Sequence, residues 1–266
     1  MATSGEGQHD KIYEFGAKVS FGKTADDYSS HRAGFPDAFF ELLKDRRWAS
    51  EGQAVLDIGT GTGTVARGLH EIGCKVVGTD PSEEMLAQAR KHSSDIHFVT
   101  ASAEDLPFGD ASFDLVTAGQ CWHWFHRANA ADEASRVLRP DGRILIAHFD
   151  WLPLPGNVVS ATEALILSYN PEWAAGGGTG MYPAWLNDLG TAGFTDIETA
   201  SFDVAQPYSH AAWRGRIRAS AGVAASLSAD KVSRFDADLA AVLNRNFQDD
   251  PLIVPHRVWI ATARKT

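Results

Sequence analysis

The stretch from Val55 to Gly73, VLDIGTGTGTVARGLHEIG, decides the fold of this 266-residue chain. It opens with an apolar run that suits a buried strand, and residues 64–72 follow the pattern of a helix. Between them stand glycines at three alternate positions, Gly59, Gly61 and Gly63. Glycine allows positive φ and lets a ligand approach the backbone closely. The stretch therefore predicts a strand, a ligand-binding turn and a helix.

The alternation of strand and helix continues along the chain. Further strands are predicted at 75–80, 96–101, 113–120 and 143–150, separated by helices at 82–92 and 127–138 and, before the last of them, by an RPDG turn at 139–142. Such alternation indicates parallel strands joined by right-handed crossovers. Two later strands, 195–204 and 252–266, complete a Rossmann-like, doubly wound α/β sheet of seven strands, mostly parallel with an antiparallel C-terminal strand.

Composition and charge exclude several classes of partner. The formal net charge of −10 lacks the basic footprint of a nucleic-acid-binding protein. No apolar run approaches the length needed to span a bilayer, and the first residues lack the apolar core of a signal peptide. The two cysteines, Cys74 and Cys121, suggest neither a disulfide framework nor a metal site. We therefore expect a cytoplasmic protein that binds no nucleic acid, membrane or metal.

The glycine turn alone leaves its ligand open. A dinucleotide pattern G-x-G-x-x-G counted from Gly59 would need a third glycine where Thr64 stands. Counted from Gly61, the pattern ends at Ala66, and alanine is tolerated there. The dinucleotide interpretation is therefore strained without being excluded.

Two acids near the turn narrow the choice. Asp57, within the strand, would crowd a pyrophosphate but suits a ligand with an ammonium group, reached directly or through water. Asp80, at the end of the second strand, is placed to accept hydrogen bonds from ribose hydroxyls. Each has a purely structural alternative: Asp57 as a turn or helix-capping acid, and Asp80 as a capping residue before Pro81 and Ser82.

These segments resemble the class I S-adenosylmethionine-dependent methyltransferases, in particular the group called type 11. The stretch VLDIGTGTG is similar to the first motif of that family, and VVGTDPSEEML to its second. ASAEDLPFGDASFDLVTAG resembles its third and fourth elements, and EASRVLRPDGRILIA its following helix, turn and fifth strand. The N-terminal arm and the final VWIATARK also resemble a subgroup that includes trans-aconitate methyltransferase and related small-molecule enzymes.

The resemblance implies S-adenosylmethionine as cofactor and assigns residues to it. Gly59, Gly61 and Gly63 would surround its amino-acid half, Asp57 would hold the ammonium group through the local network, and Asp80 would bind both ribose hydroxyls. The remaining cofactor residues are Met85 on the adenine, Ala103 and Glu104 at the adenine edge, Gln120 near the methionine part, and Tyr28 and Arg32 in the arm. Ser102 stands where the family often has aspartate, so Glu104 is the expected substitute. Arg32 is open to the alternative of a solvated surface arginine.

The segment GQCWHWFHR follows the fourth strand, where the family places its methyl acceptor. His123 is the candidate for contacting or deprotonating a hydroxyl acceptor, because imidazole titrates near pH 7. A carboxylate acceptor would need no base, and His123 could instead be a packed structural residue. The candidates for lining the acceptor pocket are Trp122, His126, Trp151 and Tyr182.

The resemblance also suggests a division of the chain. Residues 1–46 would be an arm and helix that cover the cofactor, 47–150 the cofactor-binding core, 151–183 an inserted helical cap, and 184–266 the rest of the core with additional helices and the final strands. The cap contains a GGG run at 176–178, which suggests mobility.

Three functions remain in contention. The first is methyl transfer from S-adenosylmethionine to a small-molecule acceptor, at a carboxylate or hydroxyl oxygen. The second is an NAD-dependent oxidoreductase, and the third a non-catalytic protein that binds S-adenosylmethionine. The sequence leaves the acceptor and the oligomeric state open.

Overall fold

The computed structural model describes residues 34–266. They form two compact units. The sheet unit consists of residues 34–149, Tyr182–Ser201 and Val258–Thr266. The helical unit consists, among the described residues, of Asp150–Met181 and Phe202–Arg257.

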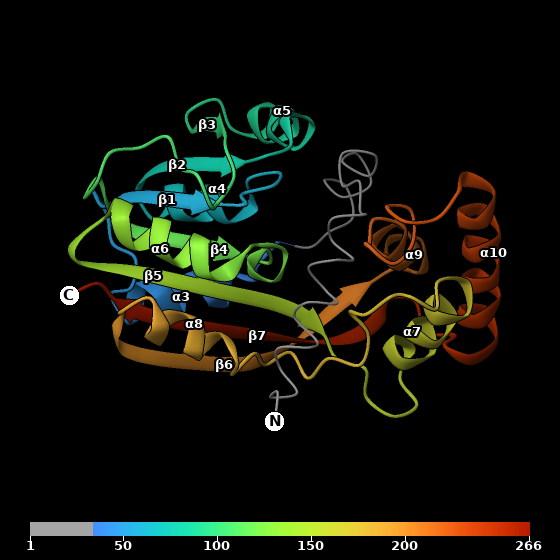
Figure 1. The fold of residues 1–266 in the computed structure, drawn as a ribbon. Helices are drawn as coiled ribbons and strands as arrows, with labels where there is room; N and C mark the ends of the chain where they lie inside the picture. The colour runs from blue at the N-terminus through green and yellow to red at the C-terminus, as the bar shows by residue number, and fades with distance from the viewer. Residues whose placement is uncertain (1–33) are drawn as a thin grey trace, which may run out of the picture. The chain divides into compact units, whose positions relative to one another are not determined.

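The sheet has seven strands in the order β3-β2-β1-β4-β5-β7-β6 (Figure 1). Their bounds are β1 Ala54–Ile58, β2 Lys75–Asp80, β3 His97–Thr100, β4 Phe113–Gly119, β5 Leu138–Trp151, β6 Thr195–Tyr208 and β7 Leu252–Arg264. The neighbouring strands from β3 across to β5 all pair in parallel. The predicted α/β class is therefore confirmed, with strand positions close to those that the sequence indicates.

Strand β7 runs against its neighbour β5. The N–H of Asp141 donates to the carbonyl of Lys265 at 3.0 Å, and the N–H of Lys265 donates to Gly142 at 2.8 Å. Further along β5, the N–H of Leu152 donates to the carbonyl of Pro255 at 2.9 Å. Residue numbers fall on β7 as they rise on β5, which confirms the predicted antiparallel strand.

Strand order reverses at β1, which lies between β2 and β4. In sheets of this kind, ligands bind beyond the carboxyl ends of the strands at such a reversal. The pairing register places Asp57 of β1 opposite Gly78 of β2 on one side and Thr117 of β4 on the other. The glycine turn follows β1 directly, so the fold puts it at the reversal.

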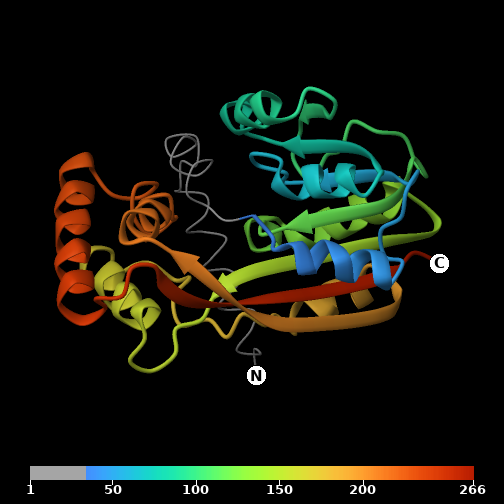
Figure 2. The ribbon, with the colours of Figure 1, turned by 180° about the vertical axis from the view of Figure 1, so that it is seen from behind.

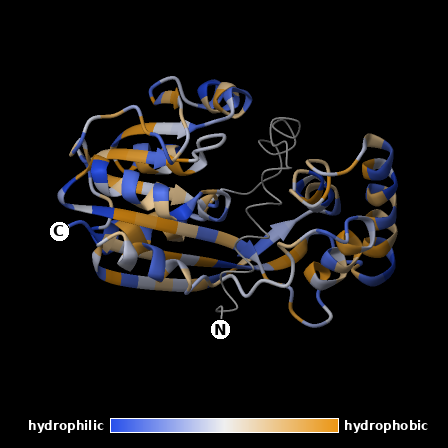
Figure 3. Ribbon diagram, viewed as in Figure 1, coloured by the Kyte–Doolittle hydropathy of each residue, from blue (hydrophilic) through white to orange (hydrophobic). Residues whose placement is uncertain are grey.

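Helices cover both faces of the sheet. Those of the sheet unit are α3 Asp37–Asp45, α4 Thr64–Glu71, α5 Glu83–His92, the short 3-10 helix η2 Trp122–Trp124, α6 Arg127–Val137 and α8 Trp185–Thr191. Figure 1 shows α6 and α8 in front of the sheet, and Figure 2 shows α3 and α4 on its other face. The central strands between these layers are apolar (Figure 3) and contribute fully buried side chains such as Leu56, Val116 and Ile144.

The helical unit contains α7 Val158–Tyr169, α9 His210–Arg218 and α10 Ala229–Asn246, with α10 in contact with both other helices. Arg214 and Arg218 of α9 pair with Asp236 of α10, and the fully buried Trp213 donates its indole N–H to Thr162 at 3.1 Å. The segment predicted as a separate cap thus shares a unit with two helices that come later in the chain. None of the helices within residues 34–266 has the length and apolar composition required to cross a membrane.

The predicted turn at 139–142 is wrong in form, because these residues remain within β5. The register with β4 changes from Phe113 opposite Leu138 to Leu115 opposite Arg143. An advance of two residues on β4 thus corresponds to an advance of five residues on β5. The extra residues of β5 include Asp141, whose φ is +63°. The RPDG sequence at 139–142 therefore corresponds to a bulge within β5 rather than to a turn before it.

Candidate functional site

The glycine turn has the left-handed backbone that its sequence predicts. Gly59, Gly61 and Gly63 have φ values of +61°, +57° and +78°. A Cβ atom on Gly59 would lie 2.8 Å from the side chains of both Cys121 and Phe125, so glycine is required there for space as well as for conformation.

Met85 lies beside the second glycine of the turn, Gly61. A Cβ on Gly61 would lie 3.4 Å from Cε of Met85, which places the predicted adenine-packing residue beside the turn. Met85 is buried, on the first turn of α5. The structure therefore brings together two groups of predicted cofactor residues that are 20 or more positions apart in sequence.

Asp57 is a buried acid that organises the turn. Its two carboxylate oxygens accept hydrogen bonds from the hydroxyls of Thr60 at 2.6 Å and Thr117 at 2.7 Å, and it also accepts from the backbone N–H of Ala66 in α4. These contacts give Asp57 the turn and helix-capping role that the sequence left open as its structural alternative. Any contact with a ligand ammonium group would come in addition, through this network. Both threonines were missed in the sequence; the role of Thr117 depends on the β1–β4 register, whereas Thr60 lies only three residues after Asp57.

Burial raises the pKa of Asp57 from 3.8 to about 6, although the threonine hydroxyls act in the opposite direction. A folded-state pKa above the unfolded value means that the contribution to stability is full below pH 3.8 and is lost as the pH rises through 6. We expect Asp57→Asn to gain stability relative to the wild type between pH 4 and pH 7, by roughly 2–3 kcal/mol. Urea unfolding of both proteins across this range measures the difference. A difference independent of pH would contradict the expectation.

Asp80 links the end of β2 to the glycine turn. One carboxylate oxygen accepts the N–H of Gly61 and the other the N–H of Ser82, each at 2.9 Å. The helix-capping role belongs to Ser82, whose Oγ accepts the N–H of Met85 at 3.3 Å. Burial raises the pKa of Asp80, and the two backbone donors oppose that rise. A carboxylate oxygen offers more than one lone pair, so Asp80 keeps capacity for further donors.

The segment after β3 holds the two residues predicted at the adenine edge. Ala103 is buried, and Glu104 is half-buried with one oxygen accepting the backbone N–H of His126 at 2.8 Å. That bond satisfies a donor at the start of α6, which would otherwise lack an intrahelical partner. Glu104 therefore has a structural role in addition to the predicted contact with an adenine amine.

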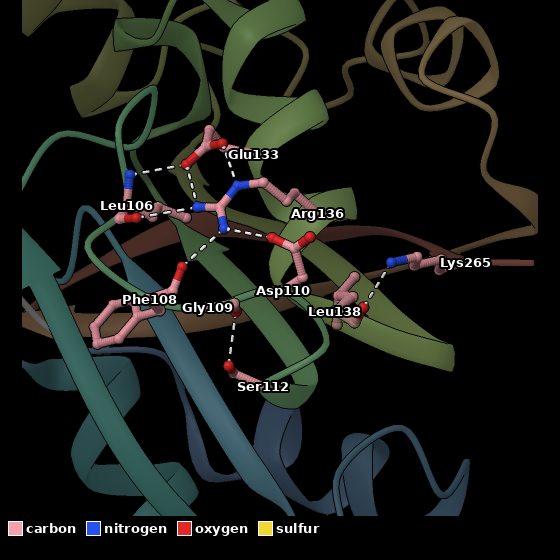
Figure 4. Close-up of polar contacts among 9 residues, drawn as sticks. All are labelled: Leu106, Phe108, Gly109, Asp110, Ser112, Glu133, Arg136, Leu138 and Lys265. Atoms are coloured by element: carbon pink, nitrogen blue, oxygen red, sulfur yellow. Dashed lines mark hydrogen bonds and ion pairs between the residues drawn. The ribbon is translucent and has the colours of Figure 1, made fainter.

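Arg136 of α6 fixes the same segment in place (Figure 4). Its guanidinium donates to the carbonyls of Leu106 at 3.0 Å and Phe108 at 2.8 Å, and to the carboxylate of Asp110 at 3.0 Å. Glu133, one turn earlier, accepts from Arg136 and also from the N–H of Leu106 at 2.9 Å. Bonds to Glu133 and Asp110 raise the pKa of Arg136. One side chain thus holds three points of the segment that carries Ala103 and Glu104.

We expect Arg136→Ala to destabilise the protein by about 1–2 kcal/mol, because several charge-assisted bonds are lost at a partly exposed site. Urea unfolding measures the loss, and amide hydrogen exchange should quicken at residues 104–112. Arg139→Ala is the matched control, since Arg139 pairs with the single acid Asp114 near the surface. Equal effects of the two variants would show that Arg136 is an ordinary surface arginine.

The residue that directly follows strand β4 has a strained backbone. Gln120 has a φ of +64°, which is unusual for a residue other than glycine. Its backbone N–H donates to Ala147 at 2.8 Å, and its side-chain amide donates to the carbonyl of Phe149, so two contacts with β5 stabilise the conformation. Such strain is common at functional sites, and the position of Gln120 next to the ligand stays a prediction.

The predicted acceptor residues separate into buried and accessible ones. Trp122 is fully buried and donates its indole N–H to Asp188 at 3.1 Å, with Arg127 3.4 Å from the same carboxylate. It has no surface to offer a ligand, so its predicted role in lining the pocket is corrected to packing. His126 is exposed at the start of α6, and Tyr182 is half-buried.

His123 has a partner that the sequence did not reveal. Its Nδ1 lies 3.2 Å from Nε2 of His148, a residue of β5 that is 2% exposed. Tyr182 packs against His148 with ring centroids 4.6 Å apart. The signal for His148 was a single histidine inside the apolar run of β5, and such a residue is inconspicuous without the pairing register.

Trp151 belongs to the helical unit and has its own polar partners there. Its indole N–H donates to Glu163 at 2.8 Å, and Arg216 lies over its ring at 4.8 Å from the centroid. Glu163 also accepts the N–H of Gly177 at 2.8 Å, and burial raises the pKa of this carboxyl. The glycine-rich run predicted to be mobile is therefore fastened to α7 at one point.

Two predicted residues, Tyr28 and Arg32, lie outside the described residues. Within residues 34–266, no group of three or more histidine, cysteine or acidic side chains is arranged to hold a metal ion.

Known methyltransferases are similar to this chain over the region that contains the glycine turn. Residues 56–146 match the family model described as a methyltransferase domain. An uncharacterized methyltransferase of Schizosaccharomyces pombe is 30% identical over 184 residues, which are 69% of this chain and 71% of that protein.

Shorter matches reach higher identity. An uncharacterized methyltransferase of Mycobacterium bovis is 36% identical over 126 residues, 47% of this chain and 50% of the relative. A malonyl-[acyl-carrier protein] O-methyltransferase of Enterobacter lignolyticus is 36% identical over 128 residues, 47% of this chain and 49% of the relative. In both cases the match spans about half the length of the relative.

Among solved structures, a putative methyltransferase of an antibiotic biosynthesis pathway from Anabaena variabilis superimposes with a TM-score of 0.63. It is 21% identical, and the match covers 87% of this chain and 99% of that one. This likeness supports the fold.

Proposed function

The chain belongs to the class I S-adenosylmethionine-dependent methyltransferases, and from this premise we propose that it methylates a small molecule at an oxygen atom. The observation that carries the proposal is the bond between the carboxylate of Asp80 and the N–H of Gly61 at 2.9 Å. It joins an acid suited to ribose hydroxyls to a glycine turn suited to an amino-acid group. Asp80 and the turn thus form a single binding surface at the reversal of strand order.

The donor and acceptor groups of this surface fit S-adenosylmethionine. Asp80 retains lone pairs for two hydroxyls, and the glycines, which have no side chain, let a ligand approach the backbone of the turn closely. Met85 offers an apolar surface for an adenine ring from beside Gly61. We propose the same cofactor roles for Gly63, Ala103, Glu104 and Gln120, and for the N-terminal residues Tyr28 and Arg32.

S-adenosylmethionine supplies a methyl group on a positively charged sulfur, and the sulfur–methyl bond breaks as the bond from the acceptor oxygen forms. The chain's task is to hold the acceptor in line with that bond, and alignment of this kind contributes a large part of the rate. The half-buried aromatic rings of Trp124 and Tyr182 would exclude water there and tolerate a nearby positive charge. His123, within the same group of rings, would contact the acceptor oxygen.

Support for an oxygen acceptor comes from His123, an imidazole in the segment that follows β4, and from the O-methyltransferase among the relatives. The family model matches residues 56–146, which contain most of the proposed cofactor residues. The acceptor atom is therefore proposed from the chemistry of the side chains rather than from this match. Trp151, His126 and Tyr182 remain proposed contacts for it.

A titration tests the cofactor. Calorimetry should show micromolar binding of S-adenosylmethionine and S-adenosylhomocysteine and no binding of NAD. Binding of NAD alone would replace this proposal with the oxidoreductase alternative. Binding of S-adenosylmethionine without methylation of any phenol, alcohol or carboxylic acid in a broad panel would favour the non-catalytic alternative.

A further inference from the structure

Asp57 is a carboxyl group that the sheet encloses almost completely. Its side chain is 1% exposed, at the position of β1 that pairs with Gly78 of β2 and Thr117 of β4. Its described partners are the hydroxyls of Thr60 and Thr117 and the backbone N–H of Ala66. None of these three groups carries a positive charge, so none of them balances the charge of an ionised Asp57.

The charged side chain that acts on Asp57 makes its ionisation harder. Within residues 34–266, this group is Asp80 at the end of β2, and two like charges disfavour each other. The groups that face Asp57 from β4 and α4 are the uncharged Thr117 hydroxyl and Ala66 N–H. Burial, together with the second acid, raises the pKa of Asp57 to about 6. Asp57 is therefore present in both its protonated and its ionised form near pH 6.

The two threonines suit both forms of Asp57, because a hydroxyl can donate a hydrogen bond or accept one. When Asp57 is ionised, both hydroxyls donate to it, Thr60 at 2.6 Å and Thr117 at 2.7 Å. When Asp57 carries a proton, its own O–H donates to one threonine oxygen, and that hydroxyl rotates to accept it. The network therefore allows Asp57 to gain or lose a proton without a displacement of the side chains.

The ligand proposed for the glycine turn carries a positive charge on its amino-acid half. S-adenosylmethionine and S-adenosylhomocysteine share this ammonium group. A nearby opposite charge favours the ionised form of a carboxyl group. Linkage then requires that ionisation of Asp57 strengthens ligand binding by the same factor by which the ligand favours ionisation.

We propose that the ammonium group of the cofactor displaces a proton from Asp57 as it binds, and that Thr117 is the positioning residue whose hydroxyl stabilises the ionised carboxylate. This inference rests on the proposed function. The O–H bond of the carboxyl group breaks, its electron pair stays on the carboxylate oxygen, and the proton passes to the buffer. No covalent bond of the ligand changes.

The test is calorimetric titration of the full chain with S-adenosylhomocysteine at pH 6, in phosphate and in Bis-Tris, two buffers with different ionisation enthalpies. The dependence of the heat on the buffer should correspond to release of about 0.5 proton per ligand, and the affinity should rise about five- to tenfold from pH 5 to pH 7. The related 5′-methylthioadenosine has the ribose and the adenine but no ammonium group, and it should release far less. Equal release with both ligands would assign the proton to a group beside the ribose, such as Asp80, and overturn the proposal.

Two substitutions of buried threonines separate positioning from packing. Thr117→Val keeps the side-chain shape but removes a donor to the carboxylate, so the pH midpoint of binding should move upward and the affinity at pH 6 should fall about threefold. Thr117→Ser should restore the midpoint. Thr79→Val is the matched control, because Thr79 is fully buried in β2 and its hydroxyl has no hydrogen-bond partner among the described residues. A midpoint unchanged in Thr117→Val, or shifted equally in Thr79→Val, would contradict the inference.

Asp57→Asn removes the titrating group, so its release of protons should vanish. Release that persists in this variant would belong to another group. If the variant binds too weakly for calorimetry, the carboxyl ¹³C signal of Asp57, assigned by its loss in Asp57→Asn, decides the question in the wild type. It should titrate near pH 6 in the chain alone and remain ionised at pH 5 with S-adenosylhomocysteine. Absence of S-adenosylhomocysteine binding at any pH would refute the proposed function, whereas binding without proton release would refute this inference alone.

Discussion

Replacement of Asp80 by alanine should weaken the binding of S-adenosylhomocysteine by about 100-fold or more. Two hydrogen bonds from ribose hydroxyls to a carboxylate contribute roughly 3 kcal/mol or more together, and about 1.4 kcal/mol corresponds to a factor of ten. The variant also loses the bond that ties Gly61 to the end of β2, so the turn becomes less ordered. Isothermal titration calorimetry measures the change directly.

Asp95→Asn is the control for Asp80→Ala, because Asp95 is an exposed acid just before β3. It removes the same charge and should leave the affinity unchanged. Asp80→Asn helps to separate the two effects, since its carbonyl can still accept one backbone N–H. An affinity in Asp80→Ala equal to that of the wild type would remove Asp80 from the cofactor site.

The second large effect is expected at Gly59. A Cβ there would lie 2.8 Å from Cys121 and Phe125, and the residue would also be held at a φ of +61°. The left-handed backbone costs about 1–2 kcal/mol for an ordinary residue, and overpacking adds about 1–3 kcal/mol. Gly59→Ala should therefore lower the free energy of unfolding by roughly 2–5 kcal/mol, as measured by urea denaturation.

Gly52→Ala isolates the backbone part of that cost. Gly52 has a φ of +83°, and a Cβ there would meet nothing within 4 Å. Its loss of stability should stay near 1–2 kcal/mol. If the two variants lost equal stability, the packing of Cys121 and Phe125 against the turn would have no energetic weight.

Most of the sheet could be predicted from local sequence. The strand at Ala54–Ile58, the turn with its three glycines and the capping residue Ser82 are all encoded within short windows, and the structure places them where the sequence does. The seven-stranded α/β class follows from that alternation together with the family resemblance. The bulge at 139–142 was taken for a turn, because both use the same residue types.

Contacts that depend on strand register could not be predicted. His123 and His148 are 25 positions apart, and they meet only because β4 and β5 pair in one particular register. Thr117 reaches Asp57 across 60 positions for the same reason. Trp122 was taken for a ligand contact because an aromatic cluster looks alike whether it lines a pocket or fills a core. Residues 150–181 and 202–257 form one unit although they are separated in the sequence, so no single continuous segment could have predicted it.

The bonds described for Trp151 and Glu163 begin and end within the helical unit, whereas those of Asp57, Asp80 and the glycine turn stay within residues 34–149. Replacement of residues in the helical unit therefore leaves the bonds of Asp57, Asp80 and the glycine turn with all of their partners. Substitutions within Asp150–Met181 and Phe202–Arg257 replace no partner in the bonds described for Asp57, Asp80 and the glycine turn.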